Sequence, residues 1–258
     1  MADDSNVPAP IAVKSNVGGK SRSSNSQKEG SVKYLKAQET ADQMQLQEGL
    51  EINVFADEEK FPEIANPVQM AVDTKGRLWV AAWPTYPKWE PLKEMNDALV
   101  ILPDENRDGV ADKAITFAKV HNPTGFEFWN GGVIVASAPD LIFLKDTDGD
   151  DRADLQEVLF TGFGPGDTHA GPSNLRYGLD NWIYGTVGYS RFNGEVNGER
   201  HNFGSGTFRF KSDGSKMEFL HQYNNNTWGI GLNEQGDVFG STANNNPSFF
   251  GGVPSRVH

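Results

Sequence analysis

A unit made of a strand, a tight polar turn and a second strand occurs four times in this chain, and this repeat constrains the fold most. The copies span residues 70–80, 126–135, 175–184 and 230–239, each with Gly, Asn or Asp in its turn. Successive turns lie roughly fifty residues apart, as the four-stranded blades of a propeller require. The repeat therefore predicts an all-β chain that folds as a β-propeller.

A second hairpin follows the first within each of the first three units. Its strands are predicted at residues 99–102 with 114–117, 141–144 with 155–160, and 207–210 with 216–219. These hairpins divide the chain into blades of roughly 66–118, 121–163 and 169–223, with a fourth that begins at Thr227. About three and a half blades leave an edge of unpaired backbone groups, so we expect a truncated piece of a longer propeller.

The N-terminal part differs in composition from the repeats. Residues 1–30 are rich in Ser, Asn, Gly and Lys, which predicts a disordered segment or linker. Residues 31–48 favour a short helical lead-in, because Ala, Gln, Glu and Lys dominate there. Residues 50–56 are predicted as the first strand, and residues 49–258 as the partial propeller.

Charge and cysteine content exclude several classes of function. The formal net charge is -12, which argues against nucleic acid or an anionic membrane surface as the main partner. The chain has no Cys, so disulfides, thiolate metal sites and a CxxCH haem attachment are excluded within it. No run reaches the length of a membrane span, and the first thirty residues lack the apolar region of a signal peptide.

Two Asp-rich loops form the turns of the second hairpins in the first two blades, and they begin 146 − 104 = 42 residues apart. Oxygen ligands at positions 1, 3, 5 and 9 suit a hard cation such as calcium, with a structural role. The alternative is an ordinary tight turn, which also favours Asp, Asn and Gly. Glycine stands at position six only in the first loop, as Gly109. The candidate ligands are Asp104, Asn106, Asp108 and Asp112 in the first loop, and Asp146, Asp148, Asp150 and Asp154 in the second.

A Gly- and Pro-rich loop leads into the third blade and carries His169. Such loops line one mouth of a propeller's channel, so His169 is a candidate general base with Asp167 to orient it. The alternative is a histidine that anchors the loop through hydrogen bonds.

Equivalent positions in other blades hold amides and aromatic rings. Asn226 and Trp228 begin the fourth blade, and Asn122 and Asn66 occupy the matching places in the second and first. Such a mouth suits a sugar or a planar cofactor. Trp83, Tyr86 and Trp89 form a further aromatic group, either a ligand platform or a packed satellite cluster.

These motifs, taken in order, resemble the propeller of the bacterial family of predicted membrane-bound dehydrogenases, the PVC-type haem-binding CxxCH proteins. The resemblance is carried by residues 50–56 (LEINVFA), 67–80 (PVQMAVDTKGRLWV), 166–169 (GDTH), 182–185 (WIYG) and the two Asp-rich loops. It implies a periplasmic or extracellular protein whose propeller is joined, in a longer polypeptide, to a c-type haem domain.

The chain is more distantly similar to soluble sugar dehydrogenases that use pyrroloquinoline quinone (PQQ). That similarity implies quinone-dependent oxidation of a sugar or alcohol, with His169 as the base. Arg176 and Arg191 are the candidate partners of the quinone's carboxylates, with Asn226 and Trp228 nearby. Two alternatives stay open: a non-catalytic, calcium-stabilised module that binds a glycan or partner domain, and a lactonase-type hydrolase with a metal in the channel.

Overall fold

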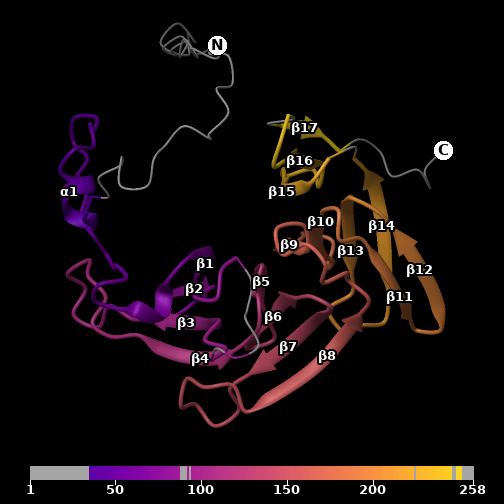
Figure 1. Cartoon of the computed structure of the whole chain (residues 1–258), viewed down its shortest axis with the longest axis horizontal. Coiled ribbons are helices and arrows are strands. Elements are labelled where there is room, and N and C mark those ends of the chain that lie inside the picture. The colour runs from indigo at the N-terminus through magenta and orange to yellow at the C-terminus, as the bar shows by residue number, and fades with distance from the viewer. Residues whose placement is uncertain (1–34, 88–91, 93, 224, 246–247, 252–258) are drawn as a thin grey trace, which may run out of the picture. The chain divides into compact units, whose positions relative to one another are not determined.

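The computed structural model describes residues 35–87, 92, 94–223, 225–245 and 248–251 (Figure 1). It divides into two units, Met1–Leu46 and Gln47–His258. The described part of the first unit contains the short helix α1 (Ala37–Ala41), where Glu39 accepts a hydrogen bond from the Lys36 N–H. This helix is shorter than the predicted lead-in, and the predicted disorder at residues 1–30 lies outside the described residues.

The second unit consists of antiparallel sheets whose strands are joined by hairpins, as the repeat predicts. The first sheet contains β1 (Pro67–Val72), β2 (Leu78–Ala82), β3 (Ala98–Leu102) and β4 (Ile115–Lys119). The second contains β5 (Gly125–Trp129), β6 (Gly132–Ser137), β7 (Asp140–Lys145) and β8 (Leu155–Thr161). The third contains β9 (Pro172–Tyr177), β10 (Ile183–Val187), β13 (Gly206–Phe210) and β14 (Met217–Gln222). The last contains β15 (Thr227–Leu232), β16 (Val238–Thr242) and β17 (Phe249–Phe250).

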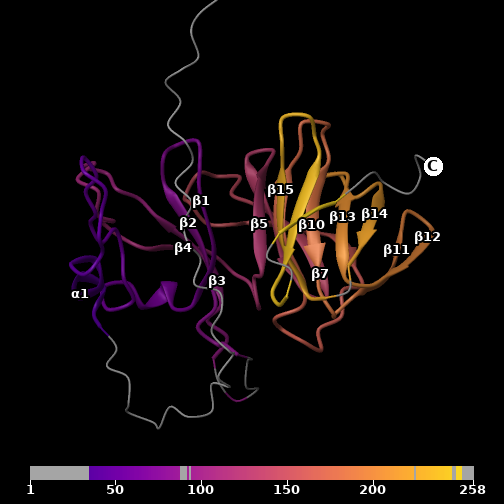
Figure 2. The same cartoon turned by 90° about the horizontal axis from the view of Figure 1, so that it is seen from above.

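The inner strands of these sheets contact one another in chain order: β1 with β5, β5 with β9, and β9 with β15 (Figure 1; β1, β5 and β15 are seen from above in Figure 2). Apolar side chains fill the space between consecutive sheets. Trp79 and Phe117 of the first sheet pack against Phe126 of the second, and Phe160 of the second packs against Phe208 and Phe210 of the third. Consecutive sheets packed face to face around their inner strands are the arrangement of propeller blades, so the predicted fold class is confirmed.

The first predicted strand is wrong. Residues 50–56 are extended but form no strand, because no neighbouring strand supplies the ladder hydrogen bonds. They lie instead against the first sheet, where Phe55 and Ala56 pack on its apolar face and the Phe55 carbonyl accepts a 2.9 Å hydrogen bond from the Ala111 N–H.

A further hairpin, β11 (Phe192–Val196) with β12 (Glu199–Phe203), is inserted between β10 and β13 and was not predicted. Its turn residues Asn197 and Gly198 have φ of 48° and 82°. Asn-Gly with positive φ at both residues is the preferred two-residue hairpin turn, so the sequence did contain a signal for it. Among the described residues, no helix has both the length and the apolar character needed to cross a membrane.

Candidate functional site

The loops that lead into the inner strands surround a cavity of about 420 Å³. It draws on the first, third and fourth sheets. Its walls are aromatic, aliphatic and amide groups, and the residues that line it are Asn66, Pro67, Val68, Trp83, Tyr86, His169, Asn226, Trp228 and Ala243. We call this cavity the channel mouth.

The loop that carries His169 is held in place by its own backbone. The Ala170 carbonyl accepts hydrogen bonds from the N–H groups of Gly188 and Ser190, at 3.0 and 3.1 Å. Asn226 donates its amide to the His169 carbonyl at 3.1 Å, which ties the loop to the start of β15. His169 is therefore fixed at the channel mouth by contacts with the third and fourth sheets.

The His169 side chain lies between a carboxylate and a phenol. Its Nδ1 is 3.4 Å from Asp167 Oδ1, and its Nε2 is 3.1 Å from the Tyr86 hydroxyl. The side chain is about half exposed. Asp167 accepts a 3.0 Å hydrogen bond from the His169 backbone N–H, so its carboxylate is held beside the ring, while Nε2 contacts Tyr86, a residue of the cavity lining. A carboxylate beside one ring nitrogen is a common feature of an oriented base. The predicted pair of Asp167 and His169 thus lies together in the structure.

Aromatic rings form the wall beside His169. The Trp83 and Tyr86 rings meet edge to face at 5.3 Å, and the Tyr86 ring meets the His169 ring at 5.4 Å. Trp83 is buried, and Trp228, which also lines the mouth, is half-buried. The predicted aromatic group thus belongs to the site through Trp83 and Tyr86, while Trp89 lies outside the described residues.

Among the buried side-chain polar atoms that have no hydrogen-bond partner in the described residues, two belong to residues that line the channel mouth. They are the indole nitrogen of Trp83 and the amide oxygen of Asn226. An unpaired buried polar group costs roughly 1–3 kcal/mol. A buried group without a partner calls for an explanation such as a bound water or ligand, and both of these residues line the channel mouth.

The two predicted quinone-binding arginines lie elsewhere. Arg176 is exposed on β9 near Glu127, and Arg191 is exposed with a φ of 62° after β10. Neither lines the channel mouth, and the described lining contains no Lys or Arg. PQQ carries several carboxylates that need such partners, so these residues by themselves do not fit the quinone.

Position six has the same backbone conformation in both Asp-rich loops. Gly109 has a φ of 82°, and Asp151 has a φ of 65°. Asp is among the few residues that tolerate this left-handed region, so the missing glycine does not change the shape of the second loop.

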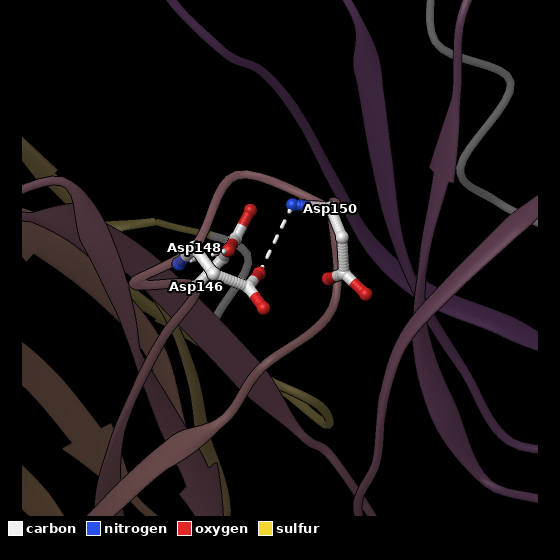
Figure 3. A group of neighbouring side chains, drawn as sticks. All are labelled: Asp146, Asp148 and Asp150. Atoms are coloured by element: carbon white, nitrogen blue, oxygen red, sulfur yellow. Dashed lines mark hydrogen bonds between the residues drawn. The ribbon is translucent and has the colours of Figure 1, made fainter.

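In the second loop the structure gathers Asp146, Asp148 and Asp150, whose oxygens lie within 4.8 Å of one another (Figure 3). Calcium binds oxygens at about 2.3–2.6 Å, so ligands across one ion are roughly 5 Å apart, and the donor set fits. The N–H of Gly149, helped by those of Asp151 and Asp148, lowers the pKa of Asp146. Asp154 turns away to accept hydrogen bonds from the N–H and hydroxyl of Thr147.

The first loop has the same backbone hydrogen-bond pattern as the second, and its carboxylates do not form a group of three. Asp104 accepts hydrogen bonds from the N–H groups of Asp108 and Gly109. The Asn106 amide donates to Asp108 at 3.1 Å, and Asp112 accepts from the Glu105 N–H at 2.6 Å. The bonds of Asp104 and Asp112 repeat those of Asp146 and Asp154 in the second loop. The difference is that, among the described residues, only the second loop gathers three carboxylates, so the case for a cation is stronger there.

Two groups of contacts near these sites were not predicted from the sequence. Arg77 of the first sheet pairs with Asp73 at 2.9 Å and with Asp151 of the second loop at 2.7 Å. The buried Asp97 accepts hydrogen bonds from Thr85, which fixes the segment that carries Trp83 and Tyr86. The pairing of Arg77 with Asp151 could not be chosen from sequence, because these residues are 74 apart in the chain.

Residues 36–255 match the domain family described as "Domain of unknown function (DUF7133)". No curated protein matches the chain. Among solved structures, the chain is similar to a Thermus thermophilus protein named "putative oxidoreductase (glucose dehydrogenase)", with 16% identity and a TM-score of 0.53. That alignment covers 74% of this chain and 62% of the other.

A gluconolactonase of Xanthomonas campestris aligns with 14% identity and a TM-score of 0.52, over 78% of this chain and 60% of the other. A Carbohydrate-Active Enzymes Family AA12 protein of Trichoderma reesei aligns with 13% identity and a TM-score of 0.51, over 74% and 52%. The chain thus spans about half to three fifths of these proteins. At such identities the likeness establishes the propeller fold alone.

Proposed function

The chain belongs to the DUF7133 family, and we propose that its propeller binds a neutral sugar or alcohol at the channel mouth as part of a dehydrogenase-like protein. The composition of the mouth carries this proposal. Its described lining combines Trp83, Tyr86 and Trp228 with two Asn side chains and His169, and has no carboxylate or fixed positive charge. Aromatic faces pack on sugar rings while amides bond to hydroxyl groups, so a neutral polyol suits this lining better than an ion.

His169 is the residue that would act on the bound ligand. A substrate hydroxyl that replaces the Tyr86 hydroxyl at Nε2 would donate to the same nitrogen, and Asp167 would hold the ring in place. Oxidation of that hydroxyl also needs a two-electron acceptor, and the described lining does not fit PQQ by itself. We therefore assign His169 only the proton transfer.

A non-catalytic module is the second candidate. The absence of Lys and Arg from the described lining favours it, as do the backbone contacts that make His169 a loop anchor. In that case the mouth recognises a glycan and performs no chemistry. A lactonase-type hydrolase has less support, because a cation in the channel would need carboxylate ligands that the described lining does not offer.

We further propose that calcium occupies the second Asp-rich loop in a structural role. Asp146, Asp148 and Asp150 would hold it, and the ion would neutralise their mutual repulsion. The resemblance stated above is the support for two wider proposals, a location outside the cytoplasm and a c-type haem domain in a longer parent protein.

Dye reduction and ligand binding, measured on the same variants, test the catalytic proposal. Neutral sugars and alcohols are supplied with calcium, an electron-accepting dye and either added PQQ or none. We expect His169→Gln to abolish dye reduction while it retains the ligand, because glutamine keeps polarity but is no base. Asp167→Asn should reduce the rate less, and Tyr86→Phe should leave the base in place.

Two results would decide against catalysis. If the wild-type chain binds a sugar but never reduces the dye, the recognition module is the better account. If His169→Gln retains the full rate, then His169 is not the base.

A further inference from the structure

An exposed tyrosine stands beside the channel mouth, in the loop that follows β10. Tyr189 is 52% exposed, yet its hydroxyl donates a hydrogen bond to Asn225 Oδ1. The Asn225 amide in turn donates to the Asn244 carbonyl at 2.7 Å, and its oxygen also accepts from the Asn226 N–H at 2.8 Å. Asn226 lines the mouth, and so does Ala243, the residue before Asn244. The Tyr189 hydroxyl is therefore anchored at the rim of the cavity.

The backbone on either side of Tyr189 is bound to the loop that carries the proposed base. The N–H groups of Gly188 and Ser190 both donate to the Ala170 carbonyl, at 3.0 and 3.1 Å. The Ser190 hydroxyl donates to the Asp167 carbonyl at 2.9 Å. Tyr189 is thus fixed at its backbone by the third sheet's entry loop and at its hydroxyl by the loops of the fourth sheet.

The arrangement requires glycine at position 188. A Cβ there would collide with the Asn226 side-chain oxygen, and it would lie 2.9 Å from the Ala170 Cα. Because Gly188 has no side chain, the segment that carries Tyr189 can lie directly against Asn226, a residue of the mouth lining. The Tyr189 ring is therefore a continuation of the mouth and does not belong to a separate surface.

A ring that is exposed but held at both ends suits a flat partner such as a sugar ring. A side chain that is already ordered loses little conformational freedom when a ligand packs on it, so rigid tyrosines are efficient contact residues. The mouth has a volume of about 420 Å³, which is toward the lower end of the range for ligand pockets, about 300–1,000 Å³. A longer ligand must therefore continue across the rim, where Tyr189 lies.

We propose that the ligand is a neutral oligosaccharide, with one unit in the channel mouth and the next unit packed on the Tyr189 ring. This inference rests on the proposed function, because it takes the mouth as the site of a neutral sugar. The unit in the mouth meets His169 and Trp228, while the unit on Tyr189 adds contact area outside the cavity. Tyr189 therefore sets a preference for chain length and has no part in proton transfer.

Isothermal titration with sugars of increasing length tests this proposal. The probes are glucose, xylose and N-acetylglucosamine, and the β(1→4)-linked oligomers of each with two to four units, all with calcium present. The trimer of the sugar that binds should bind roughly tenfold more tightly than its monosaccharide, since one aromatic contact is added. Tyr189→Ala should remove this gain and leave the monosaccharide affinity unchanged. Tyr189→Phe keeps the ring and should retain most of the gain.

The matched control is Tyr177→Ala. Tyr177 is 46% exposed and donates its hydroxyl to Asn181 at 2.9 Å, much as Tyr189 donates to Asn225. It lies at the opposite end of β9 from the loop that carries His169. Its loss should change neither the monosaccharide affinity nor the gain with chain length.

The outcomes separate this inference from the proposed function. A monosaccharide that binds as tightly as its oligomers would overturn the role of Tyr189 and leave the mouth as a sugar site. A gain that survives in Tyr189→Ala, or an equal loss for monosaccharide and oligomer, would overturn it as well. An oligomer that depends on Tyr189 but leaves the Trp228 indole signal unchanged would contradict the proposed function instead. No binding by any of these sugars would overturn both.

Discussion

The channel mouth and the second Asp-rich loop lie in different parts of the propeller, and their chemistry is opposite. The described lining of the mouth offers aromatic rings, amides and His169 but no carboxylate. The loop offers Asp146, Asp148 and Asp150 within 4.8 Å of one another. Different blades thus carry the two proposed tasks: loops of the first, third and fourth sheets line the mouth for a neutral ligand, and the outer-hairpin turn of the second sheet can hold a cation.

Removal of calcium should have the largest effect on the free energy of unfolding. It should act through the second Asp-rich loop and leave the channel mouth unchanged. An ion held at a thousand times its dissociation constant adds about 4 kcal/mol to the free energy of unfolding. We expect the urea midpoint to fall when a chelator replaces millimolar calcium.

Asp148→Asn should make the protein insensitive to the chelator, and Asp104→Asn in the first loop should change this response less. Equal urea midpoints for the wild-type chain with calcium and with chelator would show that no cation stabilises the second Asp-rich loop.

Substitution of Arg77 should have the next largest effect, because this residue joins the second loop to the first sheet. Arg77→Met removes charge-assisted hydrogen bonds to Asp73 and Asp151, which are mostly buried. The loss should lower the free energy of unfolding by roughly 2 kcal/mol. Arg152→Met is the control, since that side chain is exposed in the same loop. An equal loss in both variants would show that the contact adds nothing.

Trp228→Ala should affect the mouth and spare the loop. Loss of one aromatic wall should weaken sugar binding about tenfold, or roughly 1.4 kcal/mol. The calcium response should be unchanged. Trp182→Ala is the matched control, because Trp182 is also half-buried but does not line the mouth. If isothermal titration gives the same loss for both variants, the effect is structural and the mouth is not the binding site.

A fall in pH should have the smallest effect on the free energy of unfolding, and this effect should arise from Asp73. Burial alone would raise the pKa of Asp73, but hydrogen bonds from the Arg77 N–H, the Trp79 indole and the Arg77 guanidinium outweigh it and lower this pKa. A lowered folded-state pKa adds stability above the unfolded carboxyl pKa, and this stability is lost as the pH falls through the folded value.

The wild-type chain should therefore lose stability below about pH 4 more steeply than Asp73→Asn does. Parallel curves of unfolding free energy against pH would show that Asp73 makes no such contribution.

Local features of this fold could be predicted from sequence, and distant pairings could not. Turns such as the one at Gly76 follow from residues next to one another in the chain, so the hairpins were confirmed. The bond between His169 and Tyr86 joins residues 83 apart, and the one between Arg77 and Asp151 joins residues 74 apart. Residues 50–56 were assigned to a strand because their composition favours one, whereas a strand also needs a partner.

Titration of a neutral monosaccharide such as glucose, followed by the indole N–H signals of the tryptophans, shows whether the channel mouth binds a neutral ligand. If the channel mouth binds the sugar, the Trp228 and Trp83 signals should shift and saturate, and the Trp182 signal should change little. The matching sugar acid should bind more weakly. Shifts confined to Trp182, no saturation, or stronger binding of the acid would contradict a channel mouth built for a neutral ligand.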